Sequence, residues 1–538
     1  MKIHQPGLVL LTLPLIAGLL NGQIAEDPGS YQESIVVRLV EIDVVVTDRS
    51  GKRVHGLTPA DFELFEGRKR QRITNFTEYG NERKAGGLET PTPTSNPQSV
   101  AARREAHSLI ILMDSLPRQG FVRSRAIASL KSMLPSLIAG EDDRVSVVLW
   151  DGRYQRPRTL LEPSADRNQV MAVLDRLEGA NVATAGDPGI KLENQLVDEG
   201  ARAAASSGRG SLTDVPGQKE TNEYVAGELE LMFFRRKIAG MTRLVHALGG
   251  QQGKKTVLYV ENRFTFPSGP GARLAAVGIL ANLVREANAA GVTFYSVGPD
   301  NDEDTDELIT RRSPGEGSSW VSLRSRQSDA LRYLTLPTGG LYGFGPVETI
   351  GSPMAEDLSS YYSIAYQARS DGRDRERKIV VRARNAEYHV RSRTAIVEKS
   401  KESMARDTVV ETLFSRAGRQ EIPFNVEKGA PKKAGRERWL VPIVVRIPSS
   451  GLQFATEGRE KVARIRIMIA ASNGLAEVTP LAESDLRVVA GKDDADGFVK
   501  YSVEILRDIR GSELAVGVYD TRSGLQGVTT IDNRGPVE

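Results

Sequence analysis

Between residues 107 and 298, apolar strand-like segments alternate with amphipathic helical segments, and this alternation constrains the fold more than any other feature. The strand-like segments read SLIILMDS, RVSVVLWDG, KTVLYVEN and VTFYSVGP. A helical segment between the first two places Leu130, Leu134 and Leu137 on one face. Such alternation predicts an α/β fold with a doubly wound, mostly parallel sheet covered by helices on both faces. Ligands of these sheets bind at the carboxyl ends of the strands, where Asp114 ends the first strand.

The residues before this region have a different pattern, with short apolar runs separated by tight turns. Residues 33–80 alternate apolar and polar side chains, and turns at Ser50-Gly51 and Glu66-Gly67 separate the runs. This pattern predicts an N-terminal β module, or alternatively edge strands of the following domain. Residues 81–106 are rich in Thr, Pro and Ser and have no hydrophobic period, which predicts a linker.

The rest of the chain, residues 107–534, is predicted to consist of four segments. Residues 107–368 are assigned to the α/β domain and residues 369–398 to an antiparallel β pair with basic outer faces. Residues 399–435 are polar and irregular, which favours a linker. Residues 436–534 contain apolar runs such as WLVPIVVRI and ARIRIMIAAS at the spacing of a C-terminal β-sandwich.

The amino terminus has the organisation of a secretory signal peptide. Lys2 precedes an apolar run from Gly7 to Leu20, and Gly22 or Ala25 supplies a small residue for cleavage, so residues 1–25 are predicted to be removed. The alternative is a retained anchor, but the run of about 14 residues falls short of the roughly 20 that span a bilayer, and Pro14 interrupts it. No later segment approaches that length. We therefore expect a secreted or periplasmic protein without a transmembrane segment after cleavage.

Composition excludes several classes of function. The chain of 538 residues has 72 basic and 69 acidic residues, a formal charge of +3, which gives no electrostatic support for nucleic-acid binding. It has no cysteine, so it forms no disulfides, and this fits a bacterial envelope protein. Its five histidines form no zinc-binding pair, and the sequence lacks a phosphate-binding glycine loop and the elbow motif of a serine hydrolase.

Three segments carry a resemblance to a known family. The strand order with its Asp-Ser end resembles the von Willebrand factor type A domain. More narrowly, IDVVVTDRSGKRVHGLTPADFELFEGRKRQRITNF, PTGGLYGF and EDLSSYYSIAY resemble the VWFA-related family found in Acidobacteria. The resemblance covers about residues 33–397.

This resemblance implies an adhesion site that binds a metal ion through hydroxyl and carboxylate oxygens, which are suitable donors for Mg²⁺. In the family motif, the first strand ends in Asp-x-Ser-x-Ser, and a threonine and an acidic residue from two other loops complete the site. Here Leu116 and Arg118 replace the two serines, so we predict a degenerate site and no resident cofactor, although Mg²⁺ remains an alternative. The positions that would still form such a site are Asp114, Ser115, Thr184 and Glu261.

The loops at this end of the sheet form the predicted binding face. Their charged residues are Arg118, Arg263 and the acidic run that contains Asp300, Asp302 and Asp304. We predict an exported, non-enzymatic interaction or adhesion-like protein with an unidentified protein partner. One alternative is a metal-independent scaffold of an envelope complex, and another is an extracytoplasmic hydrolase that uses the acidic loop residues.

Overall fold

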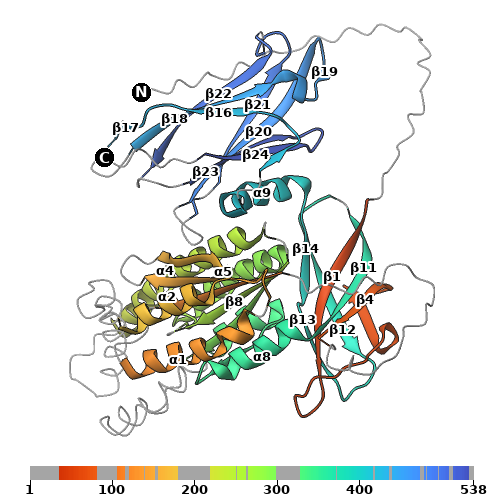
Figure 1. Cartoon of the computed structure of the whole chain (residues 1–538), viewed down its shortest axis with the longest axis vertical. Coiled ribbons are helices and arrows are strands. Elements are labelled where there is room, and N and C mark those ends of the chain that lie inside the picture. Colours follow the sequence, from red (N-terminus) through yellow and green to blue (C-terminus); the bar gives the residue numbers. More distant parts are fainter. Residues whose placement is uncertain are drawn as a thin grey trace.

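The computed structural model arranges the chain in three connected parts, an α/β domain and two parts built mainly of strands (Figure 1). The predicted signal peptide lies outside the residues that the structure describes. These are residues 36–80, 106–114, 120–138, 140–151, 156–179, 218–249, 251, 253–261, 264–298, 328–370, 372–415, 418–434, 439–472, 478–479, 481–494, 496–507 and 513–531.

The α/β domain contains one six-stranded sheet in the order β10-β9-β8-β5-β6-β7. All neighbouring strands are parallel except β6 and β7, so the sheet is mostly parallel, as the alternation predicts. The strands are β5 (His107–Asp114), β6 (Arg144–Asp151), β7 (Arg156–Ser164), β8 (Lys254–Val260), β9 (Val292–Gly298) and β10 (Tyr342–Phe344). The helices are α1 (Gly120–Leu137), α2 (Arg167–Gly179), α4 (Gln218–Gly249), α5 (Pro270–Ala290) and α8 (Glu348–Ser359), with the short helix η4 (Leu336–Thr338).

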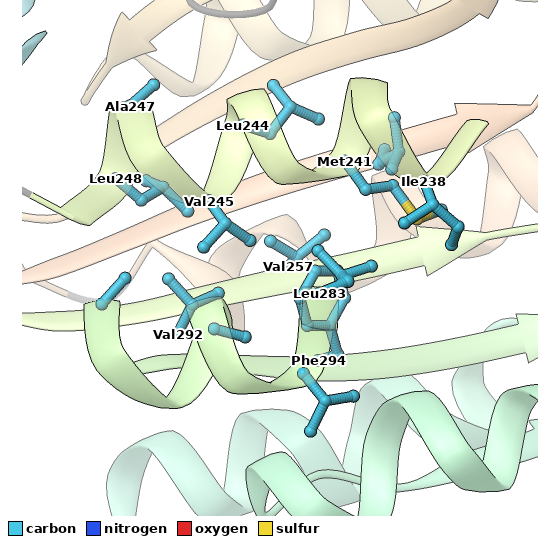
Figure 2. Packing of buried hydrophobic residues seen from close by; sticks show 14 of the residues in the cluster. Ile238, Met241, Leu244, Val245, Ala247, Leu248, Val257, Leu283, Val292 and Phe294 are labelled. Atoms are coloured by element: carbon cyan, nitrogen blue, oxygen red, sulfur yellow. The ribbon is translucent and has the colours of Figure 1, made fainter. Parts of the chain in front are cut away.

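Helices cover both faces of this sheet, because successive strand residues point to opposite sides. One core packs strand residues against α4 and α5, and the other packs the alternate residues against α1, α2 and α8. Figure 2 shows Ile238, Met241 and Val245 of α4 above Val257 of β8. Burial of each such side chain stabilises the fold by roughly 1.5–3 kcal/mol. The core therefore fixes the position of α4 along the sheet, which decides the geometry at the strand ends.

The second part is a β-sandwich made from two stretches of the chain that lie on either side of the α/β domain in sequence. One sheet has the order β13-β1-β11-β4 and the other β14-β12-β2-β3, and their facing side chains share one core. The first stretch supplies β1 (Val36–Thr47), the short helix η1 (Pro59–Asp61), β2 (Phe62–Glu66), β3 (Lys69–Gln71) and β4 (Ile73–Tyr79). The second supplies β11 (Tyr361–Ser370), β12 (Arg375–Ala383), β13 (His389–Ser392) and β14 (Ala395–Glu398).

This pairing moves the domain boundary from where the sequence pattern places it. The sequence pattern assigns residues 361–368 to the α/β domain, but β11 pairs along its length with β1 and also with β4. Residues 369–398 are not a separate basic pair, because β12 pairs with β2 as well as with β14. Residues 36–80 therefore complete their sheets only with strands that follow the α/β domain, which is inserted into the sandwich.

A buried aspartate joins the sandwich to the α/β domain. Asp357 of α8 is 2% exposed and accepts a hydrogen bond from the Tyr295 hydroxyl at 2.6 Å. The sandwich supplies two cations to it: Arg391 of β13 at 2.5 Å, and Arg53 from the turn after β1. Burial raises the pKa of Tyr295, and the Asp357 carboxylate raises it further. Its neutral hydroxyl is therefore a stable donor to the carboxylate.

The third part begins with a helix in a segment whose sequence favours an irregular linker. Helix α9 (Lys401–Ser415) buries Ala405, Val409 and Leu413 in the same core as α4 and α5. It lies between the C-terminal sheets and the α/β domain (Figure 1). At Gly517 of the neighbouring strand, a Cβ would lie 2.4 Å from Cγ2 of Val409. The helix forms because both neighbours cover its apolar side chains, which a pattern of short apolar runs does not reveal.

The C-terminal strands form two antiparallel sheets around a common core. One sheet has the order β15-β24-β23-β20-β19 with β21 beside β20, and the other has β16, β17 and β22 paired with β18. The strands are β15 (Arg419–Gln420), β16 (Asn425–Lys428), β17 (Lys432–Lys433), β18 (Trp439–Pro448), β19 (Ala455–Glu457), β20 (Glu460–Ser472), β21 (Ala482–Val489), β22 (Phe498–Arg507), β23 (Glu513–Asp520) and β24 (Gln526–Ile531), with the short helix η5 (Ser449–Gly451). Within the described part of the chain, no helix has both the length and the apolar character to cross a membrane.

Candidate functional site

The structure brings together two of the residues that the sequence predicts for the site. Asp114 is the last residue of β5, and Glu261 directly follows β8, the parallel neighbour of β5. Both residues are therefore at the same edge of the sheet. The other predicted positions lie outside the described residues; they are Ser115, Leu116, Arg118, Thr184, Arg263, Asp300, Asp302 and Asp304.

Asp114 is a buried carboxylate that already has a cation. Its side chain is on the α4 side of the sheet, and the residue is 3% exposed. The Nζ of Lys237, from the middle of α4, lies 3.0 Å from Oδ2 of Asp114. The hydroxyl of Tyr259 in β8 donates a hydrogen bond to the same oxygen at 2.8 Å. A buried carboxylate is tolerated where an opposite charge and a hydrogen bond replace the lost water, and this site has both.

Aromatic side chains lie beside the Lys237 ammonium. The neighbouring Ile238 is buried in the α4 core, and Nζ of Lys237 lies 6.0 Å from the centroid of the Trp150 ring. Tyr259 is fully buried and contacts Phe264 edge-on, with the ring centroids 5.6 Å apart. Aromatic surroundings exclude water, so the interaction between the ammonium and the carboxylate is stronger than at an exposed position.

Glu261 is turned inward and has a structural role. It is 1% exposed, and its Oε2 accepts a hydrogen bond from the Phe264 backbone at 2.7 Å. A Cβ at Gly298, which ends β9, would lie 2.3 Å from Oε1 of Glu261. The carboxylate therefore occupies space that only a glycine leaves open, and it closes the turn that follows β8.

The described residues around Asp114 do not favour a divalent cation. A metal ion bound to Asp114 would lie close to the Lys237 ammonium on Oδ2, a cation that repels it. Among the residues that the structure describes, no group of three or more His, Asp or Glu side chains is arranged to hold a metal.

Lys237 and Tyr259 are the site residues that sequence reasoning missed. Strand alternation could have pointed to Tyr259. Ile110, Leu112 and Asp114 share one face of β5, and Tyr259 lies beside Leu112 on the next strand. The position of Lys237 depends on tertiary packing, which the local pattern does not show. Residue 237 is more than a hundred positions from Asp114, and only the packing of α4 against the sheet brings its side chain to the strand end.

The first half of α4 extends beyond the strand ends. Lys237, midway along the helix, is level with the end of β5, and Gly227 packs so tightly on the start of α5 that a Cβ would lie 2.5 Å from the Ser268 carbonyl oxygen. Large apolar side chains are exposed here, with Tyr224 69% and Leu274 76% accessible. We call the strand ends of β5, β8 and β9, with the amino-terminal halves of α4 and α5, the carboxyl-end face.

Comparisons with known proteins give distant structural likenesses. No known family model matches the sequence, and no curated protein matches it either. Among solved structures, the vWF domain of the type V pili tip protein Mfa5 from Porphyromonas gingivalis is 13% identical, with a TM-score of 0.23, covering 48% of this chain and 96% of that one. Human COPII-coat protein Sec24c is 11% identical, with a TM-score of 0.24, covering 56% of this chain and 45% of that one. The pilus adhesin SpaC from Lactobacillus rhamnosus GG is 8% identical, with a TM-score of 0.23, covering 80% of this chain and 56% of that one. These scores are too low to support a functional assignment, which has to rest on the strand order and on the contacts around Asp114.

Proposed function

We propose that this protein is an exported, non-enzymatic interaction protein that binds a protein partner through the carboxyl-end face without a metal ion. One observation carries the proposal: the Lys237 ammonium is bound to Asp114 at the strand end where the family resemblance expects a metal. A metal-dependent adhesion site captures a partner carboxylate through an open coordination position. With an internal ammonium in that place, recognition has to rest on the surrounding surface.

The exposed side chains around the site suit this use. Tyr224, Val225 and Met232 of α4 and Leu274 of α5 are large apolar residues with substantial exposure. Tyrosine and other large apolar side chains contribute much of the binding energy at protein interfaces. Both carboxylates at the strand ends are buried and engaged in hydrogen bonds, so they serve the shape of the face. This arrangement favours binding over hydrolysis by the acidic residues.

A comparison of two charged double variants tests the proposal. The protein and its variants would be used as bait for an envelope extract of the cells that produce it, with and without EDTA. Tyr224→Asp/Leu274→Asp alters the carboxyl-end face. Phe498→Asp/Leu525→Asp is the matched control, because it alters two exposed apolar residues of the C-terminal part. Both doubles are first checked for an unchanged thermal transition.

We expect a partner that the wild type retains in EDTA. Tyr224→Asp/Leu274→Asp should no longer bind this partner, and Phe498→Asp/Leu525→Asp should still bind it. Loss of the partner in EDTA would show metal dependence and contradict the proposal. Loss from the control alone would favour the scaffold alternative, in which the C-terminal sheets make the contact. Hydrolysis of a glycoside or peptide panel that a single acidic substitution abolishes would overturn the non-enzymatic assignment.

A further inference from the structure

A second surface feature lies on the β-sandwich, away from Asp114, and is independent of the proposed function. It is a cavity of about 530 Å³ between η1 and the segment that joins β3 to β4. This volume is within the usual range for ligand sites, about 300–1,000 Å³. The cavity is lined by Pro59, Ala60, Phe62, Arg70, Gln71, Arg72, Ile73 and Arg384.

Three arginines give this cavity a positive charge, and we call it the arginine cleft after Arg70, Arg72 and Arg384. Arg70 lies 3.3 Å from Glu63 in an exposed ion pair. Arg72 and Arg384 are exposed and form no salt bridge with another described residue. Three guanidinium groups lie near two carboxylates, those of Glu63 and Asp61, which leaves a net positive charge.

The acidic group that precedes Phe62 in the chain is already engaged. Oδ2 of Asp61 accepts hydrogen bonds from the Thr58 backbone at 2.8 Å and from the Thr58 hydroxyl at 2.7 Å. These bonds, with a smaller contribution from the charge of Arg384, hold the pKa of Asp61 below its usual value. Asp61 is thus ionised and fixed in the turn before β2, and its charge offsets part of the charge of Arg384.

The shape of the cleft indicates what kind of anion fits. Phe62, which is 2% exposed, and the half-buried Ile73 form an apolar part of the wall. The adjoining β3 ends the sheet order β14-β12-β2-β3, so it is an edge strand in the described structure. An edge strand offers unpaired backbone groups to an extended chain, and basic residues on it repel all but an acidic partner.

We propose that the arginine cleft binds an extended acidic peptide segment of a partner protein, with its carboxylates on the guanidinium groups and its backbone along β3. Arginine forms paired hydrogen bonds with carboxylates, which gives such a site geometric selectivity. An acidic peptide with apolar residues between its acids matches both the charge and the apolar wall. The near balance of 72 basic and 69 acidic residues in the chain speaks against a nucleic acid.

Fluorescence anisotropy with the full-length protein tests this proposal. The probe is a fluorescein-labelled peptide of alternating glutamate and valine, and the matched neutral peptide has glutamine in place of glutamate. Arg72→Glu/Arg384→Glu reverses two charges of the cleft. Arg459→Glu/Lys461→Glu is the control, because it reverses two exposed charges in the C-terminal part. Circular dichroism melting verifies that both doubles remain folded, which is expected for exposed positions.

We expect the acidic peptide to bind the wild type and the control alike, and its affinity to fall at least about tenfold in the cleft double. The affinity should also fall as salt is raised. Equal binding of the neutral peptide would overturn the proposal, and so would equal loss in the control double. A single-stranded oligonucleotide of the same charge that binds as well as the peptide would also overturn it, because this would show unselective attraction.

Discussion

Two buried aspartates lie at different places in the α/β domain and use the same chemistry for different purposes. Asp114 and Asp357 are 3% and 2% exposed, and each accepts a hydrogen bond from a buried tyrosine of an adjacent strand, Tyr259 of β8 or Tyr295 of β9. These tyrosines point to opposite faces of the sheet. The difference between the sites is the source of the positive charge.

Asp114 takes its cation from within its own domain, whereas Asp357 takes two from another. Lys237 is a single flexible ammonium whose side chain is 17% exposed. Arg53 and Arg391 are planar guanidinium groups of the β-sandwich, and the Arg53 side chain is only 8% exposed. The first arrangement shapes a surface, and the second fixes two domains to each other. The consequences of removing each carboxylate should therefore differ in size.

The largest effect is expected for Asp357→Asn, which keeps the shape of the side chain and removes its charge. Two largely buried guanidinium groups then lose their shared counter-ion, and Arg53 keeps a second carboxylate, that of Glu356 at 3.5 Å. We expect a cost of about 3–5 kcal/mol of unfolding free energy. Urea unfolding followed by circular dichroism measures the loss. Asp485→Asn is the control, because this aspartate is mostly exposed beside Arg466 and should cost less than about 1 kcal/mol. A cost for Asp357→Asn as small as that of the control would contradict the role of this junction.

The α/β domain also contains a cation that burial disfavours. Lys255 at the start of β8 has a pKa lowered to about 8, mainly by burial and then by the charges of Lys399 and Arg393. The native protein therefore loses this proton at a lower pH than the unfolded chain does, and unfolding takes up a proton between about pH 8 and pH 10.5. The contribution of Lys255 to the free energy of unfolding therefore rises with pH between about pH 8 and pH 10.5.

Lys255→Met should therefore stabilise the protein by about 2–3 kcal/mol at pH 7, and the gain should shrink toward zero as pH approaches 10.5. Thermal unfolding of wild type and variant from pH 7 to pH 10.5 measures this difference. Lys492→Met removes an exposed lysine and should change stability little at any of these pH values. A gain for Lys255→Met that stays constant across the series would show that burial of the charge is not its cause.

A smaller loss is expected for Asp114→Asn, about 1–2 kcal/mol, because Lys237 can turn toward water when it loses its partner. Lys237→Met should cost a similar amount, since it removes the ammonium from a buried carboxylate. The double variant should cost about 1 kcal/mol less than the sum of the two single changes. Additive losses would show that the ammonium and the carboxylate do not act as a pair.

The smallest effects, about 1 kcal/mol each, are expected for Tyr259→Phe and Tyr295→Phe. Each removes one hydrogen bond to a buried carboxylate and leaves the ring packing unchanged. The two losses should be similar, even though the losses at the two aspartates differ. Unequal tyrosine effects, measured by the same urea titrations, would show that the hydroxyls contribute to the contrast between the sites.

The sequence predicts the sheet well because its signal is local. Apolar runs such as LIILM bury side chains on both faces, so the parallel strands β5, β6, β8 and β9 follow from the pattern, whereas the antiparallel strand β7 does not. The sandwich is harder to predict, because β1 finds its partners β11 and β13 some three hundred residues later. Helix α9 is hard to predict for the same reason, because neighbours from two domains cover its apolar residues.

Some residues of the candidate site can likewise be predicted from the sequence, and others cannot. Asp114 and Glu261 are found from their position at strand ends. The incomplete metal site that Leu116 and Arg118 indicate stays a prediction, because both lie outside the described residues. Lys237 could not be found, because a lysine in a helix is usually solvent-exposed, and only the packing of α4 brings it to a buried carboxylate. Strand and helix patterns tell where a residue lies along its element, but not which distant charge will face it.

Titration with Mn²⁺ followed by water-proton relaxation tests whether Lys237 takes the place of a metal ion at Asp114. Mn²⁺ has a ligand preference close to that of Mg²⁺, and Asp114→Asn controls for binding elsewhere on the protein. We expect the wild type and Asp114→Asn to show the same weak relaxation change, which does not saturate as Mn²⁺ is added. Saturable binding of one Mn²⁺ to the wild type that disappears in Asp114→Asn would contradict this expectation.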